Sequence, residues 1–329
     1  MFHAPTRDWT RIRDNGTIYP MNSSFKALAD RIEKHFAGDR QIVEYIGCCL
    51  FARGHVLLED VPGVGKTTLA RTFAGSLGLS FGRIQFTPDT MPGDVTGLSV
   101  YNMKTGEFNY RPGAVMSNIV LADELNRTSP KTQAALLEAM AESQVTVDGT
   151  VYPLPEPFMV IATQNPVSFT GTYPLPEAQL DRFMMRLSLG YPSEEKELEL
   201  ARARMDGLHE EEVTAVLSRD ELTRLMDDVK KVHVSDAVIS YVRQITAATR
   251  ESSSFTLGAS PRATLQLLEA ARAMAFLDGR DFVKPDDVKK TLVPVLSHRL
   301  VLTSEMRLQK MSAGRLLETI LQKIPVPAG

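Results

Sequence analysis

The sequence predicts an α/β domain, in which a parallel sheet lies between helices, followed by an all-α domain. Short apolar segments such as HVLLE (55–59) and FMVIATQ (158–164) alternate with amphipathic helical patterns over residues 23–192. Strands that are apolar throughout are typical of a parallel sheet that helices cover on both faces. From residue 193 onward the patterns are nearly all helical, and each opens on a serine, aspartate or proline typical of a helix start.

Length and composition limit the class of protein. The 329 residues suffice for two domains with a large core, and the formal net charge of −3 disfavours general binding to nucleic acid or to an anionic membrane. Cys48 and Cys49 are adjacent, a spacing that suits neither an ordinary disulfide nor a metal site, so we expect core thiols. The N-terminus has no apolar run of the signal-peptide kind, and no run of about 20 apolar residues occurs, so we expect a cytoplasmic protein without a membrane span.

The elements of both domains can be placed from their patterns. Residues 1–22 are polar, with prolines and a glycine among them, and are expected to form a flexible tail. Helices are expected at 25–37 and after Asp39, which is a suitable N-cap. The strands expected in the sheet are 55–59, 81–86, 118–123, 158–164 and 182–190, with helices at 66–78 and 131–143. The helices expected in the second domain, 193–329, are 218–232, 235–251, 260–279, 284–300 and one near the C-terminus.

Two β-hairpin patterns interrupt the α/β part. The segment 98–113 has β-prone flanks around a polar turn, and 144–154 has Asp148-Gly149 between alternating apolar residues, a strong two-residue turn signal. Two interpretations stay open, since such hairpins can be edge decoration or working loops.

The segment EDVPGVGKTT (59–68) nearly matches the phosphate-binding pattern G-x-x-x-x-G-K-[ST], but Asp60 stands in the first glycine position. In such loops, backbone N–H groups at a helix N-terminus face the phosphates, and glycines let the chain approach them. Lys66 would contact the β- and γ-phosphates, and the Thr67 hydroxyl would reach Mg²⁺. An inward Asp60 carboxylate would repel phosphate, so we expect it to point away, onto a turn N–H or a cation.

A second motif follows an apolar strand that ends in Asp123 and Glu124. Asp123 would hold Mg²⁺ through water, and Glu124 would orient and deprotonate the attacking water. Alone, the pair could equally be an acidic strand end that caps the next helix. The phosphate loop upstream favours the catalytic interpretation.

Further polar residues end other elements. Asn165 follows an apolar strand at the sheet edge where open α/β sheets bind ligands, although it could be a turn residue before Pro166. Arg182 and Arg186 could be offered to the active site of a neighbouring subunit, or could form surface ion pairs. Arg262 occupies the first turn of a helix, where a cation opposes the helix dipole, and this favours a phosphate-binding role.

These motifs occur in a fixed order, and from about residue 25 to the end the chain resembles AAA+ ATPases, specifically the MoxR family. The resemblance rests on EDVPGVGKT, RIQFTPDTMPGD, LADELNR, ATQNP, PEAQLDRF and GASPRA, which are specific only together. It implies an AAA+ P-loop NTPase core at 23–192 with two β-hairpin inserts, and an all-α lid domain at 193–329. In related motors such hairpins face the central pore or the substrate.

The resemblance also assigns roles to individual residues. It implies a Walker A motif at Lys66 and Thr67, a Walker B motif at Asp123 and Glu124, sensor 1 at Asn165, an arginine finger at Arg182 and sensor 2 at Arg262. The further nucleotide-binding residues that it implies are Gly38 near the adenine, Pro62, Gly63, Val64, Gly65 and Thr68. Thr67 and Asp123 would hold Mg²⁺, largely through water. Whether Arg182 or Arg186 is the finger stays open.

The family implies Mg²⁺-dependent hydrolysis of ATP to ADP and phosphate in a homo-oligomeric ring, expected to be a hexamer. Its implied role is chaperone-like remodelling, maturation or activation of protein partners, among them proteins with a von Willebrand factor A domain. Two alternatives are a nucleic-acid translocase and a nucleotide-gated scaffold with little turnover. The first is disfavoured because Lys104 is the one basic residue in the two predicted hairpin tips, and the second because the catalytic set is complete.

Overall fold

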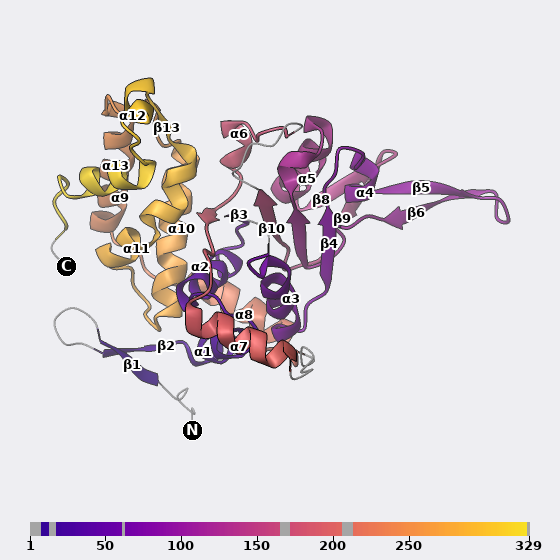
Figure 1. Cartoon of the computed structure of the whole chain (residues 1–329), viewed down its shortest axis with the longest axis horizontal. Helices are drawn as coiled ribbons and strands as arrows, with labels where there is room; N and C mark the ends of the chain where they lie inside the picture. The colour runs from indigo at the N-terminus through magenta and orange to yellow at the C-terminus, as the bar shows by residue number, and fades with distance from the viewer. Residues whose placement is uncertain (1–7, 13–17, 61–62, 165–171, 206–212, 328–329) are drawn as a thin grey trace.

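The computed structural model describes residues 8–12, 18–60, 63–164, 172–205 and 213–327. Its centre is a five-stranded sheet in the order β11-β3-β10-β7-β4, and all four pairings are parallel (Figure 1). The strands are β3 (Val56–Glu59), β4 (Phe81–Gln85), β7 (Ile119–Asp123), β10 (Met159–Gln164) and β11 (Met185–Leu187). The predicted parallel sheet is confirmed.

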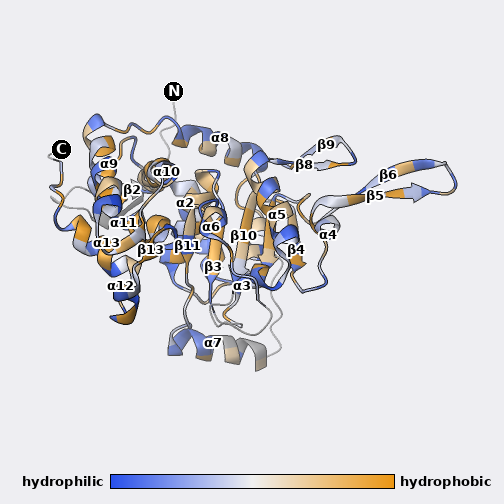
Figure 2. Ribbon diagram, turned by 90° about the horizontal axis from the view of Figure 1, so that it is seen from above, coloured by the Kyte–Doolittle hydropathy of each residue, from blue (hydrophilic) through white to orange (hydrophobic). Residues whose placement is uncertain are grey.

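The apolar strands are buried on both faces, as their sequences predict. In β3, Val56 and Leu58 face the cluster formed with helices α1 to α3, whereas Leu57 faces the cluster formed with α5. The helices up to residue 205 are α1 (Ser23–Glu33), α2 (Arg40–Phe51), α3 (Lys66–Ser76), α4 (Pro92–Thr96), η2 (Leu125–Arg127), α5 (Pro130–Glu142), α6 (Glu177–Leu180) and α7 (Glu194–Met205), the last of which lies beyond the predicted boundary at residue 192. Figure 2 shows the central strands as the most apolar part of the molecule.

The C-terminal part is helical and packs on the first. Its elements are α8 (Arg219–Val229), α9 (Asp236–Glu251), β12 (Phe255–Leu257), α10 (Pro261–Leu277), α11 (Pro285–Leu296), η3 (Ser297–Arg299), β13 (Val301–Leu302), α12 (Ser304–Leu308) and α13 (Ala313–Leu321). Ser218, Ser235 and Ser260 cap α8, α9 and α10 through their side chains, as the start signals predict. The apolar cluster runs without a break from α2 into α10, so the lid and the core share packing.

The adjacent cysteines are buried thiols on α2, as expected. Both are free and have no exposed surface, and the Cys48 Sγ lies 3.2 Å from the carbonyl oxygen of Ala270 on α10. Burial raises the pKa of both Cys48 and Cys49, so neither thiol ionises near neutral pH. They therefore belong to the interface between α2 and the lid.

Both expected hairpins form, and one projects far from the body of the molecule (Figures 1 and 2). The strands are β5 (Gly97–Asn102) with β6 (Glu107–Pro112), and β8 (Gln144–Val147) with β9 (Thr150–Pro153). Tyr110 and Tyr152 stack with ring centroids 3.9 Å apart and join the two hairpins at their bases. The hairpins are therefore anchored to each other, and they also contact the helices α4 and α5.

The N-terminal region differs from its prediction. Residues 8–12 and 18–21, expected to belong to a flexible tail, form the antiparallel strands β1 (Asp8–Ile12) and β2 (Ile18–Met21). The sequence holds Asn15-Gly16 between β-prone residues, and this pair is a strong hairpin signal. The division of the chain at residues 22 and 192 stays a prediction. In the part of the chain that the structure describes, no helix is long and apolar enough to cross a membrane.

His55 is a buried histidine at the start of β3, and we expect it to make stability depend on pH. Its Nδ1 accepts a hydrogen bond from Val160 N–H at 3.1 Å, so the proton sits on Nε2, which faces the Met140 carbonyl oxygen at 3.2 Å. Burial lowers the pKa of His55 from 6.5 to about 4. Between these values the unfolded chain binds a proton that the native chain does not, so stability should fall as the pH falls, by about 1.4 kcal/mol per pH unit at most.

Denaturant unfolding at pH 7.5, 6 and 5 measures this dependence. In the variant His55→Gln the native protein should be less stable at pH 7.5, and its free energy of unfolding should change less between pH 6 and 5. His233→Gln, which removes an exposed histidine, is the matched control. An unchanged pH slope in His55→Gln would contradict the assignment.

Candidate functional site

The loop before α3 brings the chain to the edge of the sheet with two left-handed glycines. Gly63 has φ +89° and Gly65 has φ +87°, and Gly65 is the N-cap of α3. A Cβ on Gly63 would meet no heavy atom within 4 Å, so the restriction there is the backbone conformation and not space. The loop therefore delivers the N-terminus of an 11-residue helix, which attracts anions, to the carboxyl edge of β3.

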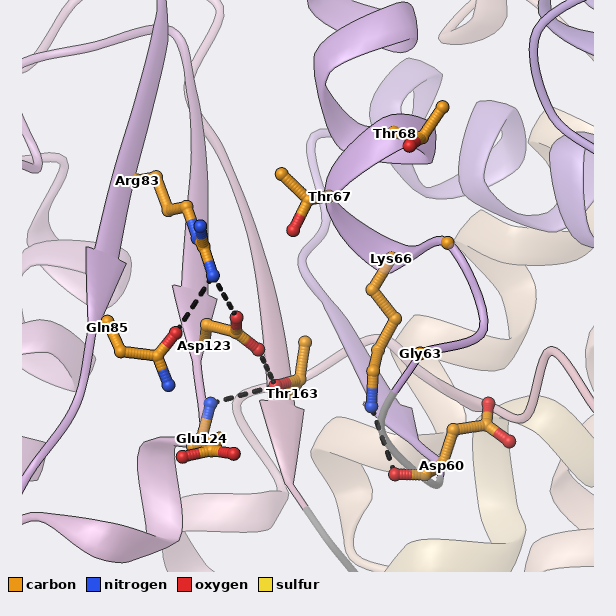
Figure 3. A pocket seen from close by; sticks show the side chains of 11 residues that line it. Asp60, Gly63, Lys66, Thr67, Thr68, Arg83, Gln85, Asp123, Glu124 and Thr163 are labelled. Atoms are coloured by element: carbon orange, nitrogen blue, oxygen red, sulfur yellow. Dashed lines mark hydrogen bonds and ion pairs between the residues drawn. The ribbon is translucent and has the colours of Figure 1, made fainter. Parts of the chain in front are cut away.

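A cavity of about 320 Å³ opens at this edge. The residues that line it come from the loop and α3 and from the ends of β4, β7 and β10, and they are Asp60, Gly63, Gly65, Lys66, Thr67, Thr68, Arg83, Gln85, Asp123, Glu124 and Thr163 (Figure 3). Because all strands are parallel, their carboxyl ends meet at one edge, where open α/β sheets bind ligands. The structure thus brings the two predicted motifs together.

Asp60 points away from the phosphate-binding face of the loop, as expected. Its carboxylate accepts hydrogen bonds from the Ser188 hydroxyl at 3.0 Å, from Gly190 N–H at 3.3 Å and from Leu189 N–H. Only its backbone carbonyl faces the cavity, where it accepts a hydrogen bond from the Lys66 ammonium at 3.0 Å (Figure 3). The carboxylate therefore connects the start of the loop to residues 188–190, which follow β11. It does not occupy the N–H groups of the loop, so these can bind an anion.

Thr163 on β10 organises the acidic pair on β7. Its hydroxyl donates to Asp123 Oδ1 at 2.7 Å and accepts from Glu124 N–H at 2.8 Å. Thr163 is buried, with 1% of its surface exposed, so the contact fixes both partners. The motifs of the sequence do not predict this residue, although its place one residue before the end of an apolar strand could have suggested it.

Arg83 and Gln85 on β4 also reach the site and were not predicted. One guanidinium nitrogen of Arg83 donates to Asp123 Oδ2 and to Gln85 Oε1, each at 2.9 Å (Figure 3). The available signal is the alternation in FGRIQF, which puts Gly82, Ile84 and Phe86 on one face of the strand and the two polar residues on the other. The second oxygen of Asp123 is thereby paired with a cation of the same subunit.

Glu124 stands just after β7 in a left-handed backbone conformation, with φ 57°. Its Oε2 accepts a hydrogen bond from the Arg127 guanidinium at 2.7 Å, and about a third of its side-chain surface is exposed, 31%. The carboxylate is thus in contact with water, while its backbone is fixed through Thr163. A general base needs both a fixed backbone position and access to a water molecule.

The other predicted residues lie around the cavity without lining its described part. Gly38 packs under the ring of Phe36, and the same ring also lies next to Gly65. The carbonyl oxygen of Gly38 accepts a hydrogen bond from Lys196 on α7. Val64 packs against the apolar cluster on the α1–α3 face of the sheet. Pro62 and Asn165 lie outside the residues that the structure describes.

The three candidate arginines have different environments. Arg182 donates to the carbonyl oxygen of Leu137 on α5 at 2.6 Å, and Arg186 pairs with Glu59 at 3.2 Å, within the sheet. Arg262 is exposed in the first turn of α10, as predicted from its sequence. The structure does not bring Arg182 or Arg262 into the described lining of this chain's own cavity.

Comparison with known proteins gives the family. Residues 55–185 match the model of the ATPase family associated with various cellular activities (AAA), and residues 247–320 match that of the AAA lid domain. The chain is 42% identical to Chaperone MoxR1 of Mycobacterium tuberculosis over 305 residues, which covers 90% of this chain and 80% of MoxR1. The chain belongs to the MoxR family of AAA+ ATPases.

Other similar proteins agree with this placement in the MoxR family. The chain is 48% identical to the uncharacterised protein YeaC of Bacillus subtilis, over 91% of this chain and 93% of YeaC. It is 30% identical to the protein MoxR of Methylorubrum extorquens, over 93% and 97% of the two chains. A crystal structure of a predicted ATPase from Cytophaga hutchinsonii superposes with a TM-score of 0.87 at 40% identity, covering 93% of this chain and 95% of that one. The predicted core with its lid is thus confirmed.

We expect the substitution Asp60→Gly, which restores the loop consensus, to cost stability without strengthening ATP binding. It removes the acceptor of the buried Leu189 N–H, and a buried N–H group without a partner costs about 1 to 3 kcal/mol. It also removes the acceptor of Gly190 N–H, but Gly190 is exposed and water can replace that contact. Denaturant unfolding and titration with a fluorescent ATP analogue measure the two effects. Asp60→Asn, which keeps one acceptor oxygen, should lose less stability, and a hundredfold gain in ATP affinity for Asp60→Gly would contradict this role.

Proposed function

We propose that this MoxR-family chain hydrolyses ATP with Mg²⁺ at the cavity between α3 and β7. The observation that carries the proposal is the convergence of a helix N-terminus, Lys66 and Thr67 with Asp123 and Glu124 on one cavity. The helix N-terminus and Lys66 attract anionic phosphates. Asp123 supplies an oxygen ligand for the ion, and Glu124 supplies the base that hydrolysis of a phosphoanhydride needs.

The donor atoms suit Mg²⁺ without forming a closed cage. A hydroxyl from Thr67 and a carboxylate from Asp123 are hard oxygen ligands, and Mg²⁺ in phosphate sites takes one or two such groups with water and phosphate oxygens. When bound, the ion neutralises charge on the transferred phosphoryl group. Arg83 pairs with Asp123 Oδ2, so an ion held by Asp123 through water would share this carboxylate with the guanidinium.

The chain's own residues then divide the work. The loop N–H groups and Lys66 hold the phosphates, and Lys66 exchanges the carbonyl of Asp60 for phosphate oxygens. Glu124 takes the proton of the attacking water, and Arg127 holds its carboxylate before the water is in place. Asn165 and Arg262 complete the γ-phosphate contacts in the proposed assignment, in which Gly38 lies beside the adenine.

We further propose a homo-oligomeric ring, a hexamer, in which Arg182 acts on the site of the neighbouring subunit. Support comes from its absence from the lining of the described cavity of its own subunit, and from the engagement of Arg186 with Glu59. The name Chaperone MoxR1 of a relative supports remodelling of protein clients, and a von Willebrand factor A domain protein in the same cytoplasm is the partner class that we propose.

The β5–β6 hairpin favours a protein over a nucleic acid as client. Its exposed side chains include Val100, Tyr101, Met103 and Phe108, and Lys104 is the basic residue at its tip. Tracking a phosphate backbone requires several cations, because release of counterions supplies most of the affinity. An apolar arm with Lys104 at its tip and Arg111 near its base suits a polypeptide client better.

Two substitutions separate binding from turnover. Lys66→Ala should lose ATP binding, because it removes the point charge on the β- and γ-phosphates. Glu124→Gln should bind ATP with nearly unchanged affinity and release phosphate at least about a hundredfold more slowly, because the amide cannot accept the proton. Filter binding of labelled ATP and a phosphate-release assay measure both.

The matched control is Glu142→Gln, which changes an exposed acid at the end of α5 and should leave both quantities unchanged. Rapid steady hydrolysis by Glu124→Gln would overturn the assigned base. The absence of hydrolysis by the unsubstituted protein with Mg²⁺ would instead favour a nucleotide-gated scaffold.

A further inference from the structure

The segment that carries Arg182 is held from both sides by the lid. Arg182 lies between α6 and β11, and its neighbours Asp181 and Phe183 are bonded to three lid residues. We call Ser260, His298 and Arg299 the lid clamp. Because consecutive Cα atoms are a fixed 3.8 Å apart, a shift of Asp181 or Phe183 also displaces Arg182.

Arg299 is the centre of the lid clamp. Its Nε donates to Asp181 Oδ1 at 2.7 Å, and its terminal nitrogens reach the carbonyl oxygens of Asp181, Phe183 and Met184. The side chain is almost completely buried, with 2% exposed. Burial lowers the pKa of Arg299 to about 10, so the guanidinium stays charged at neutral pH, and the Asp181 carboxylate favours that charge.

Ser260 joins this centre to the helix that carries Arg262. Its hydroxyl lies 3.2 Å from Asp181 Oδ2 and accepts from Ala263 N–H at 3.1 Å, so it caps α10 and contacts Asp181 at the same time. Gln266, which lies one helical turn after Arg262 on α10, accepts a hydrogen bond from Arg299. One carboxylate is therefore shared between the start of α10 and η3.

His298 holds the other neighbour of Arg182. Its Nε2 lies 3.1 Å from the carbonyl oxygen of Phe183, which also accepts from Arg299. The guanidinium of Arg182 itself reaches Leu137 in the core. The backbone on both sides of Arg182 is thus fixed to the lid, whereas its side chain is fixed to the sheet domain.

We propose that Asp181 and Arg299 are positioning residues that couple α10 to Arg182. Movement of α10 with the nucleotide of one subunit then changes how that subunit presents Arg182 to the next site in the ring. The proposal rests on the proposed function, namely a nucleotide contact by Arg262 and an action of Arg182 in trans. A lid helix and a finger that share one carboxylate give such coupling a physical path.

A buried ion pair at this place could instead serve stability alone, and the two roles predict different effects. A coupling role acts on the neighbouring site, so it should appear only where the altered subunit supplies Arg182. A stabilising role should weaken the altered subunit in every position of the ring. The test therefore needs rings in which both subunit types bind ATP, one type supplies the finger and only the other hydrolyses ATP.

Mixed rings provide this separation. Donor subunits carry Glu124→Gln, so they bind ATP without turning it over and still supply Arg182. Acceptor subunits carry Arg182→Ala and keep their own Glu124, so phosphate release reports donor fingers acting on acceptor sites. Adding Asp181→Ala to the donor should lower phosphate release by roughly tenfold or more. Adding Asp181→Ala to the acceptor should leave phosphate release unchanged within about twofold, since Asp181 of the acceptor and the ATP site of the acceptor are then independent.

Three controls keep the result specific. Glu177→Ala, which removes an exposed acid on α6, should have no effect in either subunit. Asp181→Asn keeps one acceptor oxygen, which Arg299 can use, and should lose less than Asp181→Ala, again only in the donor. The affinity of Asp181→Ala for labelled ATP and its thermal midpoint should show that the protein is folded with an intact nucleotide site.

Each outcome is decisive. Equal losses in donor and acceptor, or no loss in either, would overturn the coupling. Absence of phosphate release from the starting donor–acceptor pair, with an active unsubstituted protein, would refute the action of Arg182 in trans and the proposal with it. An inactive unsubstituted protein would refute the proposed hydrolysis itself.

Discussion

The arrangement of the site depends on a parallel sheet that is buried on both faces. Because β3, β7 and β10 run in one direction, the residues that follow them meet at one edge, and helices on both faces keep the strands in register. Asp60, Asp123 and Thr163 all lie at this edge. The apolar strands therefore do more than form the core, since they set which polar side chains meet.

Within this frame, the unusual residue of the loop has a structural role. Asp60 connects the end of β3 to the chain that leaves β11 through hydrogen bonds to Ser188, Leu189 and Gly190. A glycine at the same position could not make these contacts. The loop thus departs from the consensus where the chain leaves the strand, and it keeps the two glycines whose left-handed backbone shapes the anion-facing turn.

Most of the fold and part of the site could be predicted from the sequence. Continuously apolar segments, capping serines and the Asp148-Gly149 turn are local signals, so strands, lid helices and hairpins followed from them. Position along a strand could have suggested Thr163 and Arg83. Their roles, like that of Arg127, could not be predicted, because they arise from side-chain contacts that only the folded site makes. The polar composition of residues 1–22 predicts a flexible tail, whereas the Asn15-Gly16 turn signal predicts the pairing that β1 and β2 make.

Thr163 tests the central claim most directly, because its hydroxyl fixes both acidic residues and need not touch the nucleotide itself. Phosphate release and ATP affinity should be measured for Thr163→Val, which keeps the shape of the side chain, and for Thr163→Ser, which keeps the hydroxyl. We expect Thr163→Val to bind ATP but to hydrolyse it roughly tenfold to a hundredfold more slowly, and Thr163→Ser to recover most of the rate. Turnover by Thr163→Val at the unsubstituted rate would contradict the account.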